Sequence, residues 1–277
     1  MKRMTIGVAA VVSLLATSAM AADLTAPKPY VKAPPVVATV YGWTGFYVGG
    51  NIGYGWGRSS NSVDISNLAT GATLFTNTSS NDVDGVIGGG QVGYNWQVQN
   101  WVLGLEADIQ GSDQKGSSNL VCVGCANGGT TDITTTLTQK LSWFGTVRGR
   151  AGILVTPSIL LYGTGGLAYG EFKTGGSVTG NGVGGVPVTV TFPGTSSTQV
   201  GWTVGAGVEG KIGGNWTAKL EYLYMDLGSV STGPIATTIL VPRRTDAGVS
   251  YSSALRDNIL RVGVNYQFGG GPVVAKY

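Results

Sequence analysis

The chain has 277 residues, of which 47 are glycine, two are cysteine and none is histidine, while only 11% are charged. So many glycines argue against a mainly helical domain, and the lack of imidazole excludes Ser-His-Asp hydrolysis, Cys-His proteolysis and histidine-ligated haem or zinc. The formal net charge of +3 gives no indication of nucleic-acid binding.

The N-terminus predicts export. Residues 1–21 combine a basic start at Lys2 and Arg3, an apolar stretch too short to span a bilayer, and small residues before a cleavage site after Ala21. Residues 22–42 are rich in proline, so we expect a stiff, extended periplasmic linker. No later segment has the roughly 20 consecutive apolar residues of a spanning helix. The exported chain is therefore either soluble or crosses a membrane as strands.

From Trp43 onward, side-chain polarity alternates with a period of two, which is typical of strands. In the first strand, Phe46, Ile52 and Trp56 share one face, while Tyr47 shares the other face with small and polar residues. The eight predicted strands lie around residues 46–56, 86–96, 101–110, 141–153, 159–172, 200–211, 216–224 and 260–268. The facing of the fifth strand stays ambiguous, because its alternation is weak.

The predicted connections alternate between long and short. Long polar segments lie near residues 59–82, 111–139, 173–197 and 228–255, and short ones lie at 97–100, 155–158 and 213–215. Outer-membrane barrels have this rhythm of extracellular loops and periplasmic turns. We therefore predict an all-β fold over residues 43–268, an eight-stranded antiparallel up-and-down transmembrane β-barrel with four long extracellular loops and short periplasmic turns. Residues 269–277 form a C-terminal extension.

Charge is divided between the two strand faces. With the fifth strand left aside, only Arg58, Asp84 and Asp226 fall on the apolar face, at the predicted extracellular ends. A charge facing lipid costs about 2 to 4 kcal/mol at the bilayer midplane and about 0 to 1 near its edge. The apolar face therefore points outward, and we expect a polar lumen. The charges predicted to face that lumen are Lys140, Asp257 and a network of Glu106, Asp108, Arg148, Arg150, Glu209, Lys211, Lys219, Glu221 and Arg261.

This network has two interpretations. Rings of charge set ion selectivity, so the network could gate a narrow conducting path. The same charges could instead pair with one another and hold the barrel closed in one register, because unpaired buried charge is costly. We favour the structural interpretation.

All seven tryptophans fall near predicted strand ends. The span from Phe46 to Trp56, at about 3.3 Å per residue and a tilt of about 40°, gives roughly 25 Å, the height of a barrel's apolar band. We therefore predict two aromatic girdles, a periplasmic one of Trp43, Trp96, Trp101 and Trp216 and an outer one of Trp56, Trp143 and Trp202.

Cys122 and Cys125 lie in the second long polar segment. A redox CxxC motif needs a βαβ setting, which this segment lacks. Outside the cytoplasm a small local disulfide is favoured, with metal binding and redox exchange as the alternatives.

Three segments resemble the small porin-family barrels of alphaproteobacteria, the opacity and surface-antigen outer-membrane proteins. They are VYGWTGFYVGGNIGYGWG (40–57), LLYGTGGLAYG (160–170) and LRVGVNYQF (260–268). The resemblance implies an assembly signal in the last strand, either Phe268 or the terminal Tyr277, and the stronger alternation favours Phe268. Some relatives join a mature N-terminus that begins Ala-Asp to peptidoglycan, which Ala22 and Asp23 would match.

The resemblance and the residues together define the expected role. We expect no enzyme, no cofactor and no metal site, since the barrel enzymes that resemble this architecture use a catalytic histidine. The predicted location is the outer membrane of a Gram-negative cell, with outer-membrane lipid, lipopolysaccharide, the barrel-assembly machinery and peptidoglycan as partners, and with the chain as a monomer. The predicted function is envelope integrity with polar loops displayed at the surface. The alternatives are a narrow porin-like channel for ions or small solutes and an adhesin or host-contact protein.

Overall fold

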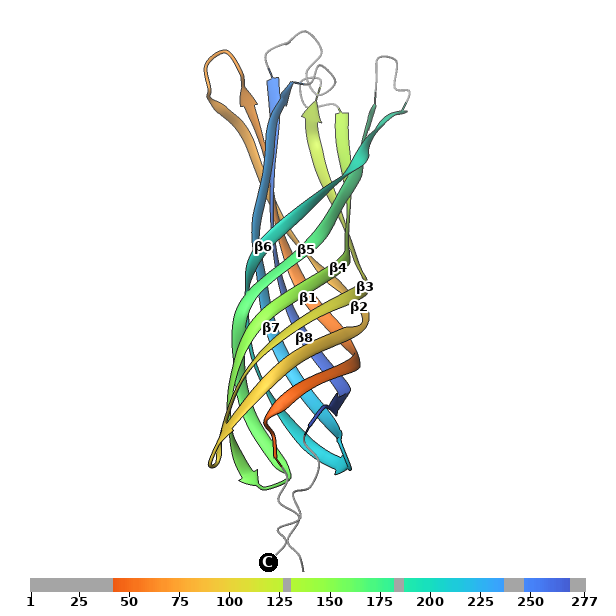
Figure 1. Ribbon diagram of the computed structural model, residues 1–277. Coiled ribbons are helices and arrows are strands. Elements are labelled where there is room, and N and C mark those ends of the chain that lie inside the picture. The colour runs from red at the N-terminus through yellow and green to blue at the C-terminus, as the bar shows by residue number, and fades with distance from the viewer. Residues whose placement is uncertain (1–41, 127–130, 182–186, 237–246, 270–277) are drawn as a thin grey trace, which may run out of the picture. The chain divides into compact units, whose positions relative to one another are not determined.

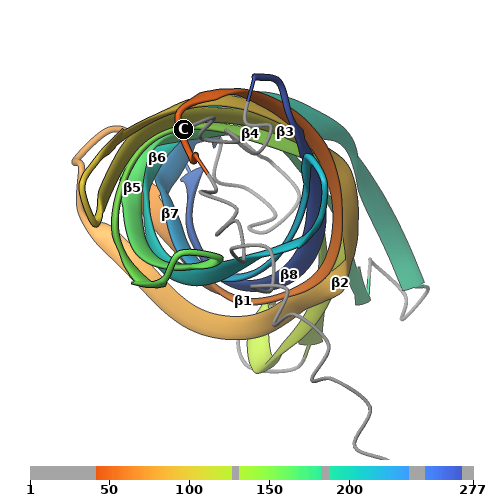
Figure 2. The same ribbon diagram turned by 60° about the horizontal axis from the view of Figure 1, so that its bottom comes forward.

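The structure is a computed structural model that describes residues 42–126, 131–181, 187–236 and 247–269. In these residues eight antiparallel strands follow one another in chain order and close into a barrel through the pairing of the first strand with the last (Figures 1 and 2). The strands are β1 (Gly45–Asn67), β2 (Thr73–Val98), β3 (Trp101–Ala126), β4 (Thr131–Thr156), β5 (Ile159–Asn181), β6 (Pro187–Gly213), β7 (Trp216–Ala236) and β8 (Ala247–Gln267). The predicted eight-stranded up-and-down barrel is confirmed.

The pleat of each strand sends successive side chains to opposite faces of the barrel wall. On β1, Phe46 is 66% exposed whereas the next residue, Tyr47, is only 4% exposed. Every strand exposes large apolar side chains in this way, for example Leu105 on β3 and Val262 on β8. Water-soluble monomers rarely expose apolar patches of this extent, and the pattern is that of a barrel whose outer face meets lipid.

The structure resolves the facing of the fifth strand. Leu160, Tyr162 and Phe172 are buried in the lumen, while Leu161 and Leu167 are exposed on the outer face. The sequence signal is weak here because several glycines between these residues have no side chain to mark either face.

The strands extend far into the four segments that we expected to be loops. β1 and β2 are separated only by residues 68–72, although the expected loop covered 59–82. These segments are rich in serine, threonine, asparagine and glycine, so the period-two contrast is weak while the backbone ladder continues. The many threonines in these segments suit a strand as well. These segments remain the long connections, but paired strands make up most of their length.

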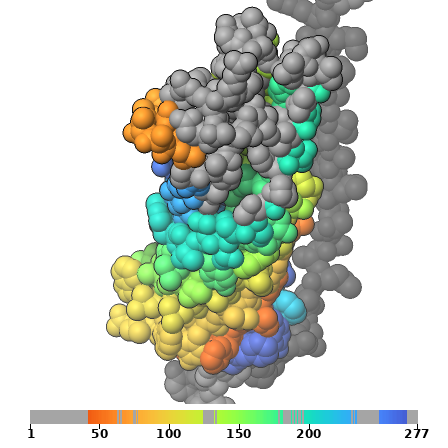
Figure 3. Space-filling model, turned by 90° about the horizontal axis from the view of Figure 1, so that it is seen from above, coloured from red at the N-terminus to blue at the C-terminus, as the bar shows by residue number. Residues whose placement is uncertain are grey.

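Above the apolar band the ring opens into two four-stranded sheets. Pairing between β2 and β3 ends at Asp84 and Lys115, and pairing between β6 and β7 ends at Trp202 and Asp226. Beyond these points one sheet contains β7, β8, β1 and β2, and the other contains β3, β4, β5 and β6. The strands separate accordingly at one end of Figure 1, and the end of the β1–β2 pair stands apart in Figure 3.

A bulge in β4 changes which face two residues occupy. The register of β4 against β5 shifts between Leu141 and Trp143, so Leu141 and Phe144 are both buried in the lumen. Lys140 lies on the outer side, 3.8 Å from Asp113. The prediction that Lys140 faces the lumen is therefore wrong, because an extra residue reverses the alternation beyond it. At this outer rim a hydrogen bond from Lys115 lowers the pKa of the Asp113 carboxyl.

The termini of the chain lie outside the described residues. This applies to the predicted signal peptide, to the linker before Gly42 and to the C-terminal extension after Gly269, which stay predictions. Within the described part of the chain, no helix has the length and apolar character to cross a membrane.

We expect hydrogen–deuterium exchange of the refolded protein in micelles to reveal the extended strands. Backbone amides of residues 59–67 and 76–82 should exchange more slowly than those of the turn at 68–72, because β1 and β2 pair through this region. Uniformly fast exchange over residues 59–82 would instead support the loop that the sequence predicted.

Candidate functional site

The lumen is the candidate site, and side chains fill it in successive layers. The lowest layer, at the end with the short turns, is a basal cluster of Trp43, Val102, Leu160 and Tyr162. Trp43 is 1% exposed, and its indole N–H donates to the Pro157 carbonyl at 3.1 Å. Trp43 therefore closes the lumen from inside, and its predicted place in the periplasmic girdle is wrong. It precedes β1, where no strand pairing orients it, but it shares the odd parity of the inward-facing Tyr47.

Above the basal cluster lies a charge network of eight side chains from five strands. Its members are Glu106, Asp108, Arg148, Arg150, Glu209, Lys219, Glu221 and Arg261. Arg148 lies at the centre, because its guanidinium binds Glu106, Asp108 at 3.0 Å and Glu221 at 3.1 Å. Three strands are thus tied together by one side chain.

Two further cations bind the same carboxylates from different sides. Arg261 lies 2.6 Å from Glu221 and 3.0 Å from Asp108, and the Lys219 ammonium lies 2.9 Å from Glu106. Arg261 and Glu221 are register partners on neighbouring strands, whereas the contacts to Asp108 and Glu106 join β8 and β7 to β3 across the lumen.

Arg150 connects the network to the basal cluster. Its guanidinium lies 2.6 Å from Glu209, and its central carbon is 4.3 Å from the ring centre of Tyr162. Tyr47 takes part from β1, since its hydroxyl donates to Glu106 at 2.8 Å and accepts from Arg150 at 3.1 Å. We did not identify the two tyrosines from the sequence, although Tyr47 already lay on the inward face of β1.

The network has no net charge and is buried from solvent. It contains four carboxylates and four cations, and each of these side chains is between 0% and 3% exposed. Removing ions from water costs several kcal/mol each, which only close pairing and further hydrogen bonds can offset. Among the described residues, no group of His, Cys, Asp or Glu side chains is arranged to hold a metal ion.

Two predicted lumen charges lie in other layers. Lys211 is at the lower mouth, where its ammonium donates to the Gly42 carbonyl at 2.9 Å and to Gln267 at 3.0 Å. Asp257 is buried nearer the outer end and accepts a hydrogen bond of 2.7 Å from Gln114. The alternation in the sequence shows which side chains point into the lumen. It does not show how far along the barrel axis they lie, so it did not separate Lys211 and Asp257 from the network.

Glycines in the wall give the large inward side chains their space. A Cβ on Gly93 would lie 2.3 Å from the Tyr47 hydroxyl, and one on Gly207 would lie 2.6 Å from the Tyr162 hydroxyl. Real Cβ atoms do not approach other atoms so closely, so both tyrosines need glycine opposite them. The excess of glycine on the inward face therefore has a steric cause.

An apolar layer lies above the charge network, contrary to our expectation of a uniformly polar lumen. Its members are Val83, Ile87, Leu141, Phe144, Ala168, Phe172, Leu223, Met225, Leu227, Leu255 and Ile259, all buried. Some of them could have been identified from the sequence, because Ile87, Leu223 and Ile259 occupy the inward positions of their strands. They are hard to recognise from the sequence because the residues on both strand faces are apolar at this height, so polarity does not alternate there.

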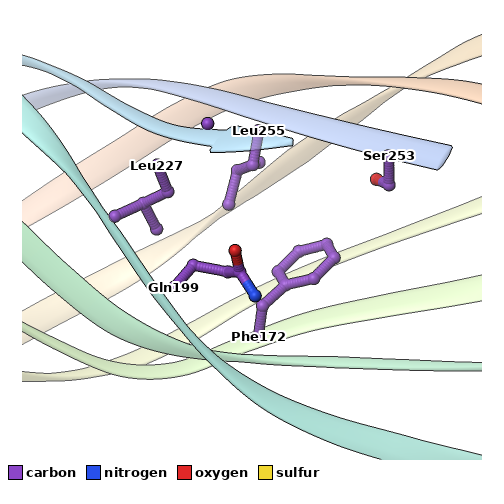
Figure 4. A pocket seen from close by; sticks show the side chains of 6 residues that line it. Phe172, Gln199, Leu227, Ser253 and Leu255 are labelled. Atoms are coloured by element: carbon purple, nitrogen blue, oxygen red, sulfur yellow. The ribbon is translucent and has the colours of Figure 1, made fainter. Parts of the chain in front are cut away.

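The outer side of the apolar layer is nearly without free space. Phe172, Leu227 and Leu255 converge there with Gln199, as Figure 4 shows, and leave a cavity of about 10 Å³. Such a volume holds one water at most. Above it lies an amide layer of Asn61, Asn81, Gln139, Tyr251 and Ser253, in which Gln139 donates to Asn61 at 2.6 Å and Asn61 to Asn81 at 2.7 Å.

The other six tryptophans lie on the outer face. Trp96, Trp101 and Trp216 are exposed near the short turns, and Trp56 and Trp202 near the outer rim. The sixth, Trp143, is partly exposed and has its ring 6.2 Å from Tyr169. Tyrosines join both sets, since Trp216 lies 5.2 Å from Tyr266 and Trp202 lies 5.5 Å from Tyr224.

Three further predicted sites remain predictions. Cys122 is disulfide-bonded, but the side chain of Cys125 lies outside the part of the chain that the structure describes. Ala22 and Asp23 also lie outside it. Phe268 is exposed on the outer face, and its backbone N–H donates to the Phe46 carbonyl at 2.7 Å, so it extends the pairing of β8 with β1.

We expect Arg148→Ala to lower the free energy of unfolding by about 3 to 5 kcal/mol, because Glu106, Asp108 and Glu221 would keep buried charge without their shared partner. Urea unfolding in lipid vesicles measures this. The matched control is Lys173→Ala on the exposed Lys173–Glu171 pair, which should change the value by less than about 1 kcal/mol. Equal effects of the two variants would show that the network contributes little.

Comparison with known proteins agrees with this architecture. The family described as outer membrane protein beta-barrel domain matches residues 7–268 of the chain. A 31 kDa outer-membrane immunogenic protein of Brucella melitensis is 36% identical over 266 residues, which cover 94% of this chain and 98% of the relative. A 22 kDa outer membrane protein of Rhizobium leguminosarum bv. viciae is 30% identical over 226 residues, which cover 82% and 78%.

Among solved structures, OprG of Pseudomonas aeruginosa aligns with a TM-score of 0.41 and 15% identity, over 81% of this chain and 96% of OprG. The family match extends over nearly the whole chain, and two relatives with 30% or more identity are outer-membrane proteins. This chain therefore belongs to the outer membrane protein beta-barrel family and is located in the outer membrane.

Proposed function

We propose that this protein is a closed, non-conducting barrel that reinforces the outer membrane and carries polar strands at the cell surface. The observation that carries the proposal is the sealed lumen, in which a neutral charge network lies between an apolar layer and a basal cluster. Ions need a continuous polar path, and an apolar constriction prevents one by excluding water.

The pairing of the charges argues in the same direction. Arg148 is 0% exposed and binds three carboxylates, so an ion entering the lumen would have to break those pairs. A selectivity ring instead presents its charges to water. The narrow-channel alternative is therefore less well supported than the structural role.

No catalytic step is part of this proposal. The chain has no histidine, and the Brucella relative is named as an outer-membrane immunogenic protein rather than as an enzyme. That name places the relative in the outer membrane and calls it immunogenic, which supports a surface role for the polar strands of this chain. A host-contact function would act through the same strands, beyond Asp84 and Lys115.

We also propose contacts for the two ends of the chain. The outward ring of Phe268, 5.1 Å from Tyr266, suits recognition by the barrel-assembly machinery, so a chain that ends at Phe268 should still assemble.

Ala22 would join peptidoglycan through the mature N-terminus. Mass spectrometry of lysozyme-digested cell-wall sacculi should then recover a muropeptide linked to Ala22, and its repeated absence would remove this contact from the proposal.

The sealed lumen predicts that the purified, refolded protein gives no steady single channels in planar bilayers and no solute-dependent swelling of liposomes. A shift of electrophoretic mobility on boiling would verify that the sample is folded. Ohmic channels whose ion selectivity changes in Arg148→Ala would replace the structural proposal with the gating one.

A second experiment uses a bacterial strain that lacks the protein. This strain should be less resistant to detergents, and the wild-type gene should restore its resistance. Unchanged resistance in the deletion strain, with a non-conducting protein, would contradict a role in envelope integrity.

A further inference from the structure

A row of four charges crosses the outer face of the barrel near its outer rim. Register partners on β2, β1, β8 and β7 form it, in the order Asp82, Arg58, Arg256 and Asp226. Three of these strands, β2, β1 and β8, are labelled next to one another on the ring in Figure 2. The two arginines are thus direct cross-strand neighbours, with an acid at each end of the row.

The row marks the upper edge of the lipid-facing surface. The next outward positions below it hold Trp56 and Asn258, and the positions after those hold Tyr54, Leu260 and Tyr222. The ring of Trp56 lies 6.4 Å from that of Tyr222, whose hydroxyl donates to Asn258 at 2.6 Å. Aromatic residues of this kind mark the boundary between acyl chains and headgroups, so the charges lie at headgroup height.

The arginine pair is only partly compensated. Like charges directly opposite one another destabilise a sheet. Arg58 lies 3.6 Å from Asp82 and Arg256 lies 3.3 Å from Asp226, so each guanidinium has its acid on the side away from the other. The two side chains are 71% and 65% exposed. An anion held between them would relieve the repulsion.

A shallow groove of about 390 Å³ begins directly above the arginines. The residues on outward strand positions that line it are Ser60, Ser62, Thr78, Ser80, Ser252 and Ala254. Ser60, with its register partners Ser80 and Ala254, occupies the outward row next to the arginines. Small side chains leave the space, and most of them carry a hydroxyl that can donate and accept hydrogen bonds.

We propose that Arg58 and Arg256 bind a phosphate of a phosphorylated glycolipid in the outer leaflet, with the attached saccharide in the serine-lined groove. Guanidinium groups bind phosphate in bidentate geometry, and hydroxyl side chains match the hydroxyls of a sugar. The acyl chains of such a lipid would lie along the apolar surface below Trp56. This order of apolar, charged and hydroxyl-bearing rows fits an anionic glycolipid better than a free anion, which would use only the middle row.

The inference rests on the outer-membrane location and not on the sealed lumen, so the two proposals can fail separately. The test measures binding to the full-length refolded protein in detergent, by native mass spectrometry. The probes are bisphosphorylated lipid A, the same lipid without its phosphates, and phosphatidylglycerol. We expect the first to bind at least about tenfold more tightly than the other two, and its affinity to fall as salt increases.

The variant Arg58→Gln/Arg256→Gln should lose about tenfold or more of this affinity. The matched control is Lys115→Gln/Lys140→Gln, which removes another exposed pair of cations that are register partners on β3 and β4. Heat-modified mobility should be retained in both variants, since all four residues lie on the outer surface.

Four outcomes would overturn the proposal, and the first three concern lipid A itself. They are unchanged lipid A affinity in the arginine variant, an equal loss in the lysine control, and equal binding of lipid A with and without phosphates. Equal binding of phosphatidylglycerol would show that any anionic lipid suffices and would also reject the glycolipid.

Discussion

A strand that crosses hydrocarbon must place all of its backbone hydrogen bonds on neighbouring strands, because lipid offers no partner. Closure of β1 on β8 satisfies this constraint. With eight strands the enclosed space is just wide enough for side chains, so closing the wall also requires filling the interior. The inward glycines, the buried tyrosines and the charge network are all consequences of this filling.

The layers within the lumen link distant strands and separate the charges from solvent. Cations from β4, β7 and β8 share carboxylates from β3 and β7, so the network links strands that are not neighbours in the wall. Buried ion pairs contribute little net stability compared with apolar packing. A register slip would leave several of these charges without partners, so their pairing would favour one register. The apolar layer then separates the network from the water at the cell surface.

The outer face is also divided into zones, which correspond to the regions of the membrane. Apolar side chains cover the band, aromatic rings border it, and the charges Arg58, Asp84, Asp226 and Arg256 begin where it ends. Beyond this line the strands no longer need a closed ring, because water can satisfy free edges. The opening into two sheets after Asp84 and Trp202 reflects this change of solvent.

The sequence by itself determined the number of strands, the outward position of the apolar face and, within the predicted spans of seven strands, the facing of nearly every residue. These features follow from a period of two, which is a local property of the chain. Only the tertiary structure decided that Trp43 closes the lumen, that Lys140 lies outside, that Lys211 lies below the network and that an apolar layer lies above it. These depend on a bulge, on cross-strand register and on height along the barrel. All three arise from pairing between distant segments, which no local pattern records.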